Sequence, residues 1–300
     1  MPAIVVDKIS KNFGSLKAVD EVSFDVENGE IFGLLGPNGA GKTTSIRIIL
    51  DIFKPDRGSV SILGGAMTEE KKNNIGYLPE ERGLYQDIPL DRCLVYLATL
   101  KGMEEKDAQR KVGEYLERFD LADAHKKKVK ELSKGMQQKA QLITTLIHKP
   151  SLVIIDEPFS ALDPVNTQMV KDLLREERNK GTAVVMCTHQ MHQVEELADR
   201  IVLINNGKAM LYGKLQDIRR NYKSQSVIVR PVNQLPAIIS GVEEIVKENH
   251  HYLLHLCEGC NSQQVLKSLL EQGIELEQFE IAIPSLDEIF IQVVKKEQPA

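Results

Sequence analysis

Hydrophobic and polar positions follow two rhythms over the first 220 residues of the chain. Short continuous apolar runs, as at 31–35 and 152–155, have the length of strands that are buried on both faces. Elsewhere apolar residues recur every three or four positions, most clearly over 90–101 and 104–119, which predicts amphipathic helices. Strands that alternate with helices are typical of a mostly parallel sheet with helices on its faces.

The same two patterns predict the other elements of this part. Apolar and polar residues alternate over 22–26, and an Asn-Gly pair at 28–29 favours a tight turn. Residues 20–35 are therefore predicted to form a hairpin. From about residue 90 to residue 150 the pattern is helical. Further strands are predicted at 4–9, 60–63, 75–78, 182–187 and 200–204, and further helices at 45–50, 133–148, 166–179 and 194–198.

The character of the pattern changes near residue 221. The segments that follow are short, and they are predicted in the order strand, helix, strand, strand, helix, strand, which is typical of a ferredoxin-like module. A final helix is predicted over 286–295. The predicted strands lie at 226–230, 242–248, 251–256 and 276–283, and the predicted helices between them at 233–239 and 262–271.

Composition narrows the possible environments and partners. The chain has 300 residues, 42% of them hydrophobic and 27% charged, which is ordinary for a globular protein. The net charge of −5 gives no general attraction to nucleic acid, so no nucleic-acid partner is expected. A short basic run, Lys126 to Lys128 with Lys130, is interpreted as a solvated face. The N-terminus lacks a signal-peptide pattern and the apolar runs are strand-sized, so we expect a cytoplasmic protein whose membrane role comes through a partner.

Four cysteines in a chain of this length do not form a disulfide framework. Cys257 and Cys260 have C-x-x-C spacing, and three histidines, His250, His251 and His255, lie nearby. There is no second cysteine pair and no downstream histidine pair. Incidental thiols are the preferred interpretation, and a metal or redox role is the alternative.

The stretch from Gly36 to Thr44, Gly-Pro-Asn-Gly-Ala-Gly-Lys-Thr-Thr, lies between a predicted strand and a predicted helix. Glycines let the backbone curl round an anion with its N–H groups turned inward, and the following helix adds the positive end of its dipole. Lys42 supplies a charge for the β- and γ-phosphates, and the Thr43 hydroxyl suits Mg²⁺. The residues predicted to surround the phosphates are Gly36, Pro37, Asn38, Gly39, Ala40, Gly41, Lys42, Thr43 and Thr44.

Two later stretches carry further candidate chemistry. The apolar strand at 152–155 runs into Asp156, which is placed to hold Mg²⁺ through water, and Glu157, which is placed to activate a water as general base. Ser133 is a plausible N-cap of the helix at 133–148, and Gly135 permits a close backbone approach. That helix start is either an anion site or a plain cap.

The order of these parts resembles the ATP-binding subunit of ABC transporters. Six features follow one another over about residues 1–220. They are the P-loop, a helical stretch, Leu-Ser-x-Gly-x-Gln, Asp-Glu-Pro, the Ser-Ala-Leu-Asp that ends at Asp163, and a Thr-His pair at 188–189. In detail the chain looks like the sodium-extrusion NatA type, through residues 78–85, 132–139 and 284–290. The resemblance implies an α/β P-loop NTPase core over 1–220, with a mostly parallel sheet, an antiparallel β subdomain and a helical insert at about 86–150. Residues 221–300 are then a small α+β, ferredoxin-like accessory domain.

The resemblance also implies roles for single residues. Phe13 matches the aromatic residue that stacks on adenine, and His189 the histidine that contacts the γ-phosphate. Ser133 and Gly135 match residues that contact ATP held by a second copy of the subunit, in a head-to-tail dimer. Asp163 matches a loop that communicates between the two nucleotides. ATP and Mg²⁺ are the implied cofactors.

Two positions depart from the family pattern. Glu80 stands where the family has glutamine, so it would bring a negative charge near the phosphates. This charge should raise the cost of charge build-up at the site unless Mg²⁺ or Arg82 offsets it. Glu80 is either a direct Mg²⁺ ligand or a cause of slower turnover. In the signature stretch, Lys134 and Met136 replace the usual glycine and glutamine. The Lys134 side chain either points to solvent, which is the preferred interpretation, or aids contact with the γ-phosphate.

The sequence therefore predicts an ATPase subunit, with Lys42, Glu157 and His189 as catalytic residues and Thr43, Asp156 and Glu80 around the metal. It would power export of Na⁺ or a toxic compound through separate membrane-spanning permease subunits, on the inner face of the cell membrane. The alternatives are a soluble ABC-type ATPase that acts on nucleic acid or ribosomes, and a nucleotide-dependent binding module that does not hydrolyse ATP.

Overall fold

The computed structural model describes residues 1–81, 83–222, 226–248, 251–257 and 259–297. The chain divides into two compact units, Met1–Leu215 and Gln216–Ala300. The sequence predicted the boundary between them at 220/221. Each unit has its own buried core.

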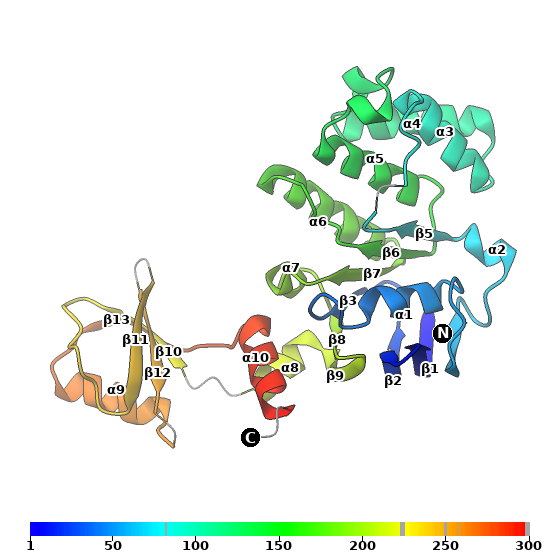
Figure 1. The fold of residues 1–300 in the computed structure, drawn as a ribbon. Helices are drawn as coiled ribbons and strands as arrows, with labels where there is room; N and C mark the ends of the chain where they lie inside the picture. Colours follow the sequence, from blue (N-terminus) through cyan, green and yellow to red (C-terminus); the bar gives the residue numbers. More distant parts are fainter. Residues whose placement is uncertain (82, 223–225, 249–250, 258, 298–300) are drawn as a thin grey trace. The chain divides into compact units, whose positions relative to one another are not determined.

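A six-stranded sheet in the order β5-β6-β7-β3-β8-β9 forms the centre of the first unit (Figure 1). Its first five strands run parallel and β9 closes one edge antiparallel. β6 and β7 are buried at every position, as their continuous apolar sequence predicts. The strands are β3 (Ile31–Leu35), β5 (Ile75–Leu78), β6 (Leu152–Asp156), β7 (Ala183–Thr188), β8 (Arg200–Asn205) and β9 (Lys208–Lys214). The helices between and after them are α1 (Lys42–Ile49), α2 (Glu69–Lys72), α6 (Pro164–Asn179) and α7 (Met191–Glu195).

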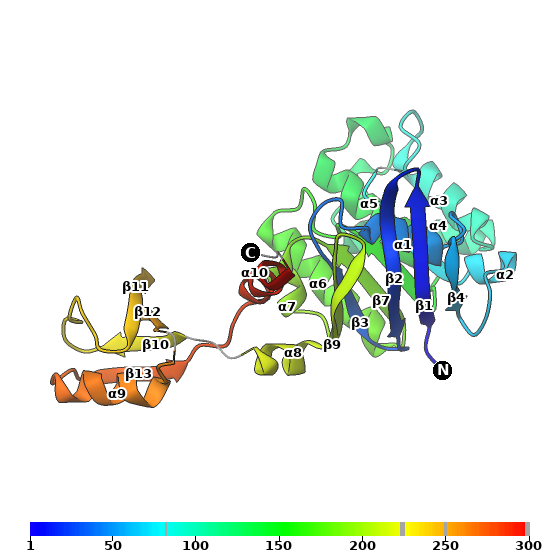
Figure 2. The same cartoon turned by 60° about the horizontal axis from the view of Figure 1, so that its bottom comes forward.

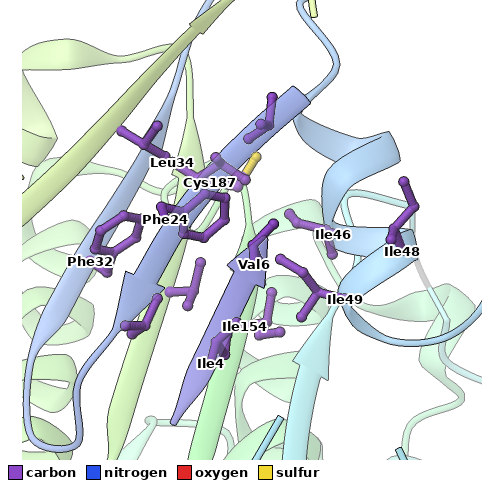
Figure 3. Close-up of a cluster of buried hydrophobic side chains, with 14 of the residues drawn as sticks. Ile4, Val6, Phe24, Phe32, Leu34, Ile46, Ile48, Ile49, Ile154 and Cys187 are labelled. Carbon is purple, nitrogen blue, oxygen red and sulfur yellow. The ribbon is translucent and has the colours of Figure 1, made fainter. Parts of the chain in front are cut away.

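A second, three-stranded antiparallel sheet has the order β2-β1-β4 and forms a separate layer (Figure 2). Its strands are β1 (Ile4–Phe13), β2 (Leu16–Val26) and β4 (Arg57–Ile62). Apolar side chains from this sheet meet those of α1 and of the central sheet in one core, where Phe24 stacks on Phe32 at a centroid distance of 5.3 Å (Figure 3). This core fixes the position of α1 and of the loop that precedes it.

The predicted hairpin at 20–35 is wrong. β2 pairs with β1, whereas β3 pairs in parallel with β7 and β8, so the turn at 28–29 takes the chain from one sheet to the other. The hairpin actually present joins β1 to β2. The apolar run of β3 is buried on both faces, and such a strand is stabilised between two parallel neighbours rather than in an exposed two-stranded ribbon.

The helical insert lies at the end of the central sheet formed by β5 and β6, where α3, α4 and α5 group together (Figure 1). It comprises α3 (Leu90–Leu100), α4 (Glu105–Arg118), the short 3-10 turns Ala122–Ala124 and Val129–Glu131, and α5 (Lys134–Leu146). α5 begins after Ser133, whose hydroxyl accepts a hydrogen bond from the Met136 N–H at 3.2 Å, so Ser133 is the predicted N-cap.

The second unit contains a four-stranded antiparallel sheet in the order β11-β12-β10-β13. This is the strand order of a ferredoxin-like module, with one of its two helices absent. Residues 233–239 form no helix, because Pro236 in the middle of this short stretch lacks an N–H donor and restricts the residue before it. The elements are α8 (Leu215–Asn221), β10 (Ser226–Pro231), β11 (Val242–Glu248), β12 (His251–Leu256), α9 (Ser262–Glu271), β13 (Leu276–Ile281) and α10 (Leu286–Glu297).

The architecture confirms the predicted P-loop core with an antiparallel β layer, a helical insert and a separate C-terminal unit. Over the described ranges, none of the helices combines the length and the apolar character needed to cross a membrane.

Candidate functional site

At two positions, the loop between β3 and α1 has a backbone conformation that only glycine can adopt. Gly36 and Gly41 have φ of 147° and 106°. A Cβ on Gly36 would lie 2.1 Å from the Ile204 carbonyl oxygen, and a Cβ on Gly41 would lie 2.3 Å from the Ala18 carbonyl oxygen. The loop can therefore close tightly against β2 and β8 only because these side chains are missing.

Lys42, the first residue of α1, is almost fully buried beneath this loop. Its ammonium donates hydrogen bonds to the carbonyl oxygens of Gly36 (2.8 Å) and Pro37 (3.1 Å). The Pro37 oxygen also accepts the N–H of Ala40 at 3.1 Å, and the Ala40 oxygen accepts the N–H of Gly207 at 2.9 Å. The loop is thus a closed, positively charged cradle at the N-terminus of a helix.

A cavity of about 590 Å³ opens beside the cradle. It brings together residues from four separate stretches of sequence that were predicted to form one site. Those residues are Phe13, Asn38, Gly39, Gly41, Lys42, Thr43, Thr44, Glu80, Asp156 and Glu157. Leu16, Lys17, Ala18, Asn206 and Gly207 also line it and were not predicted, since neither β2 nor the turn between β8 and β9 carries a sequence motif.

Phe13 ends β1 at the rim of the cavity and is 45% exposed. Its ring meets Phe53 edge-on at a centroid distance of 5.6 Å, and the Lys11 ammonium lies 5.9 Å from its centroid. One edge is thus packed while much of the ring stays accessible to a flat ligand.

Asp156 ends β6 at the floor of the cavity and is almost fully buried. Its Oδ2 accepts a hydrogen bond from the Thr43 hydroxyl at 3.3 Å. Burial raises the pKa of this carboxyl, while hydrogen bonds from the Cys187 thiol and the Thr43 hydroxyl act in the opposite direction. Cys187 is its register partner on β7. Hydroxyl and carboxylate oxygens on facing loops form a donor set that fits Mg²⁺.

Glu157 follows with φ of 54°, a left-handed conformation that is unusual for glutamate. The turn directs its carboxylate to the end of β7, where three donors meet it. The Thr188 hydroxyl donates to Oε2 at 3.0 Å, the His189 N–H to Oε1 at 3.1 Å, and the His189 Nδ1 lies 2.6 Å from Oε1. A carboxylate only accepts, so the proton of this last contact is on Nδ1.

His189 itself does not appear in the described lining of the cavity and reaches it through Glu157. Its side chain is 51% exposed, so about half of the ring surface is accessible to a ligand. Thr188 was not predicted as part of the site, although it precedes His189 in the sequence. The missed contact arises from the adjacent ends of β6 and β7, which no local pattern reveals.

Glu80 follows β5 and lines the cavity with an exposed side chain. It therefore adds a third carboxylate to those of Asp156 and Glu157. Arg82, which was considered as a charge that offsets Glu80, lies outside the described residues.

Ser133, Gly135 and Asp163 are exposed or half-exposed and are not among the described residues that line the cavity. Ser133 caps α5, and a Cβ on Gly135 would lie 3.2 Å from the Ala161 carbonyl oxygen. Asp163 caps α6 by accepting the Asn166 N–H at 2.9 Å, and this bond lowers the pKa of the Asp163 carboxyl. Lys134 is exposed, which agrees with the expectation that its side chain points to solvent.

The C-x-x-C pair lies in the second unit. Cys257 and Cys260 are free thiols, and the Cys260 N–H donates to the Cys257 carbonyl oxygen at 3.0 Å in a turn. The described part of the chain holds no group of three or more His, Cys, Asp or Glu side chains suited to a metal ion. His250 lies outside the described residues.

Comparison with known families gives two matches. A family model described as ABC transporter matches residues 19–160. A second model, described as the C-terminal domain of DrrA1-3-like ATP-binding proteins, matches residues 213–294. The two matches together extend over most of both units.

Several relatives cover nearly the whole chain. YhaQ of Bacillus subtilis, described as an uncharacterized ABC transporter ATP-binding protein, is 41% identical over 97% of this chain and 98% of its own length. The daunorubicin resistance ATP-binding protein DrrA3 of Streptomyces coeruleorubidus is 31% identical over 97% of this chain and 95% of its own. A solved ATP-binding subunit of an ABC transporter has a TM-score of 0.69 and 32% identity, over 73% of this chain and 92% of that one.

Proposed function

Because this chain belongs to the ATP-binding subunits of ABC transporters, we propose that it hydrolyses ATP to ADP and phosphate in order to power export through separate membrane-spanning permease subunits. The observation that carries the proposal is the position of Glu157. Its carboxylate is fixed at the edge of a cavity that also contains the glycine-rich loop and Asp156.

The predicted residues of the cavity have the following roles in this reaction. The backbone of residues 36–44 and the Lys42 ammonium bind the phosphates. Glu157 accepts a proton from a water, the water oxygen bonds to the γ-phosphorus, and the bond from that phosphorus to the ADP oxygen breaks. Phe13 stacks on adenine with its accessible ring.

Thr43 and Asp156 would hold Mg²⁺, with Glu80 beside them. When bound, Mg²⁺ supplies charge neutralisation along the phosphates. Until then the Thr43 hydroxyl donates to Asp156 and keeps the two oxygen ligands together.

His189 donates to Glu157 and would contact the γ-phosphate with the rest of its exposed ring. Freeing Glu157 from this hydrogen bond increases its capacity to accept a proton from water. The Thr188 hydroxyl and the His189 N–H then remain as donors that hold its orientation.

We further propose that two copies close head to tail around two ATP molecules. Ser133 and Gly135 are accessible at the start of α5 and do not belong to the cavity of their own chain, which supports a role at the cavity of a second copy. Asp163, at the start of α6, would lie between the two nucleotides. The N-terminus of α5 is suited to an anion once a partner brings one.

The test uses Glu157→Gln, which keeps the shape of the side chain and removes the base. We expect Mg²⁺-dependent phosphate release to fall by at least about 100-fold while ATP binding persists. Glu176→Gln, on the exposed side of α6, is the matched control and should hydrolyse normally. Unchanged turnover in Glu157→Gln would refute the proposed base, and absence of turnover in the unmodified chain would favour the binding module that does not hydrolyse ATP.

Partners are identified by purifying the ATP-trapped Glu157→Gln variant from membranes, followed by mass spectrometry. Recovery of a multi-span membrane protein would support the transporter and a location on the inner face of the cell membrane. Recovery of ribosomes or nucleic acid without a membrane protein would favour the soluble ATPase.

For the cargo, we propose a toxic compound rather than Na⁺. The match of residues 213–294 to a DrrA1-3-like C-terminal domain supports this choice over the NatA type, as does the DrrA3 relative named for daunorubicin resistance. Growth of a deletion strain on a panel of drugs and at high Na⁺ would distinguish the two, since sensitivity to Na⁺ alone would contradict the proposal.

The second unit, taken in the sequence as 221–300, is proposed to regulate the ATPase or to stabilise its dimer. Its support is a core of its own, made by β10, β12 and α9. Deleting the unit should alter ATPase activity or dimerisation. If folding, dimerisation and turnover were all unchanged, the idea would fail.

A further inference from the structure

Three consecutive lysines on the helical insert, Lys126, Lys127 and Lys128, form what we call the lysine run. All three side chains are exposed, and exposed His125 precedes them. Among the described residues, no carboxylate lies within ion-pair distance of these three ammonium groups, whereas Lys130 nearby is paired. Most surface charge runs are simply solvated. The position of this run therefore decides whether it also binds a partner.

The backbone of the lysine run is fixed. It lies beside the residues that lead into α3, where the Leu90 N–H donates to the Lys127 carbonyl oxygen at 2.9 Å. Lys128 forms an antiparallel bridge with Pro89. The three charges are therefore held together on one segment, and little backbone entropy is lost when they meet a surface.

Two acidic neighbours lie beside the run without forming an ion pair with it, although the Lys130 hydrogen bond and, to a smaller extent, the Lys128 charge lower the pKa of Asp87. Asp87 is paired with the Lys130 ammonium at 2.6 Å, and the Glu131 carboxylate accepts the Lys128 backbone N–H at 2.7 Å. The segment 86–91 beside the run continues directly from Tyr85. In the proposed function, the surface around Glu80 to Tyr85 and the helical insert would pass the closing motion to the permease. If this surface contacts the permease as proposed, the run lies beside the permease and close to the membrane.

Exposed aromatic rings accompany the charges. Tyr85 and Tyr96 are about half exposed and meet edge-on at a centroid distance of 5.7 Å. Tyr96 also lines one groove together with Arg92 and His125, and the carboxylates of Asp91 and Glu105 line the same groove. Tyrosine rings and basic side chains on one surface are the combination found where proteins meet the headgroup region of a bilayer.

We propose that the lysine run docks on the anionic phospholipid headgroups around the permease. This rests on the proposed function, which brings the chain to the membrane. Lipid fits better than the permease itself, because the cytoplasmic loops of membrane proteins carry an excess of Lys and Arg and would repel the run. The net charge of −5 keeps the rest of the chain away from an anionic surface, so the run also sets its orientation.

The size of the effect follows from the number of charges. A lysine near an anionic membrane strengthens binding by about fivefold, so the three together contribute about 100-fold. The attraction falls off within about 8 Å at physiological salt, which requires that the run lie close to the headgroups.

The experiment measures sedimentation of the purified full chain with vesicles of phosphatidylcholine, with and without phosphatidylglycerol. The test variant carries Lys126→Gln, Lys127→Gln and Lys128→Gln. The control variant carries the same charge change at three other exposed lysines, Lys8→Gln, Lys106→Gln and Lys214→Gln. ATPase turnover and circular dichroism of both variants report whether each is folded.

We expect binding only to the anionic vesicles, lost about 100-fold in the test variant, nearly retained in the control, and released by high salt. Equal loss in both variants, or equal binding to both kinds of vesicle, would overturn the inference. A chain that hydrolyses ATP and co-purifies with a permease but ignores anionic vesicles would overturn the inference and leave the proposed function intact. A chain without turnover or permease would count against the proposed function, whatever the vesicles show.

Discussion

The Nδ1 atom of His189 lies 2.6 Å from Oε1 of Glu157, so the proposed base and the proposed switch histidine are directly hydrogen-bonded. This contact is made across the ends of β6 and β7, and the His189 N–H reinforces it at 3.1 Å. The two residues therefore act as one unit, and a change in either should alter the other.

His189→Ala removes one of the three donors to Glu157 and the contact proposed for the γ-phosphate. We expect phosphate release to fall by about 100-fold or more, with little change in the affinity for ATP. The measurement is steady-state turnover beside equilibrium nucleotide binding. His192→Ala changes an exposed histidine on α7 and is the control. A loss of ATP affinity equal to the loss of turnover would point to a binding role instead.

Glu80→Gln restores the neutral side chain that the family has at this position. Two charges about 4 Å apart in water interact by about 1 kcal/mol, so removing this carboxylate should raise turnover about fivefold at saturating Mg²⁺. Glu81→Gln, at the exposed neighbouring position, should have no effect. If Glu80→Gln instead lowered turnover and raised the Mg²⁺ requirement, Glu80 would be a metal ligand.

Cys187→Val removes the thiol hydrogen bond that counteracts the effect of burial on Asp156. The pKa of Asp156 should rise further, and because the ionised carboxylate is needed, the acid limb of the pH–rate profile should move to higher pH. Cys187→Ser keeps a donor and should leave the profile near its original position. Identical profiles for the two variants would mean that the thiol acts only through packing.

Gly41→Ala places a Cβ 2.3 Å from the Ala18 carbonyl oxygen at a left-handed position. We expect a loss of at least about 2 kcal/mol in the free energy of unfolding and loss of ATP binding. Gly39→Ala also has a positive φ, but its Cβ would meet nothing within 4 Å, so the difference between the two variants isolates the collision. Thermal denaturation with and without ATP measures both effects, and equal melting temperatures would contradict this account.

Local patterns predicted the strand, loop and helix around Lys42 because its glycines, apolar strand and helix all lie within about twenty residues. The partner of β3 could not be predicted in this way, since β7 and β8 follow it by more than a hundred residues. A turn signal at 28–29 was therefore mistaken for a hairpin. In the second unit, the apolar spacing over 233–239 suggested a helix, but the backbone restriction from Pro236 prevailed.

The candidate site was predictable to the extent that its residues belong to motifs. Glu157 and Asp156 follow an apolar strand, so their place at a sheet edge could be inferred. The hydrogen bond from Thr188 and the thiol of Cys187 depend on which strand lies next to β6. That neighbour is set by the packing of the whole sheet, which the sequence does not display locally.

The register of the central sheet has a consequence for how the site tolerates change. Cys187 is paired with Leu34 on β3 and with Asp156 on β6, so three loops from distant parts of the chain start within one residue of a single row of paired residues. A slip of one residue between β6 and β7 would displace Thr188 from Glu157 by about 3.3 Å and turn neighbouring side chains to the opposite face. Core substitutions that preserve this alignment should leave catalysis intact even when they weaken the fold, whereas an insertion within either strand should abolish activity in a protein that still folds.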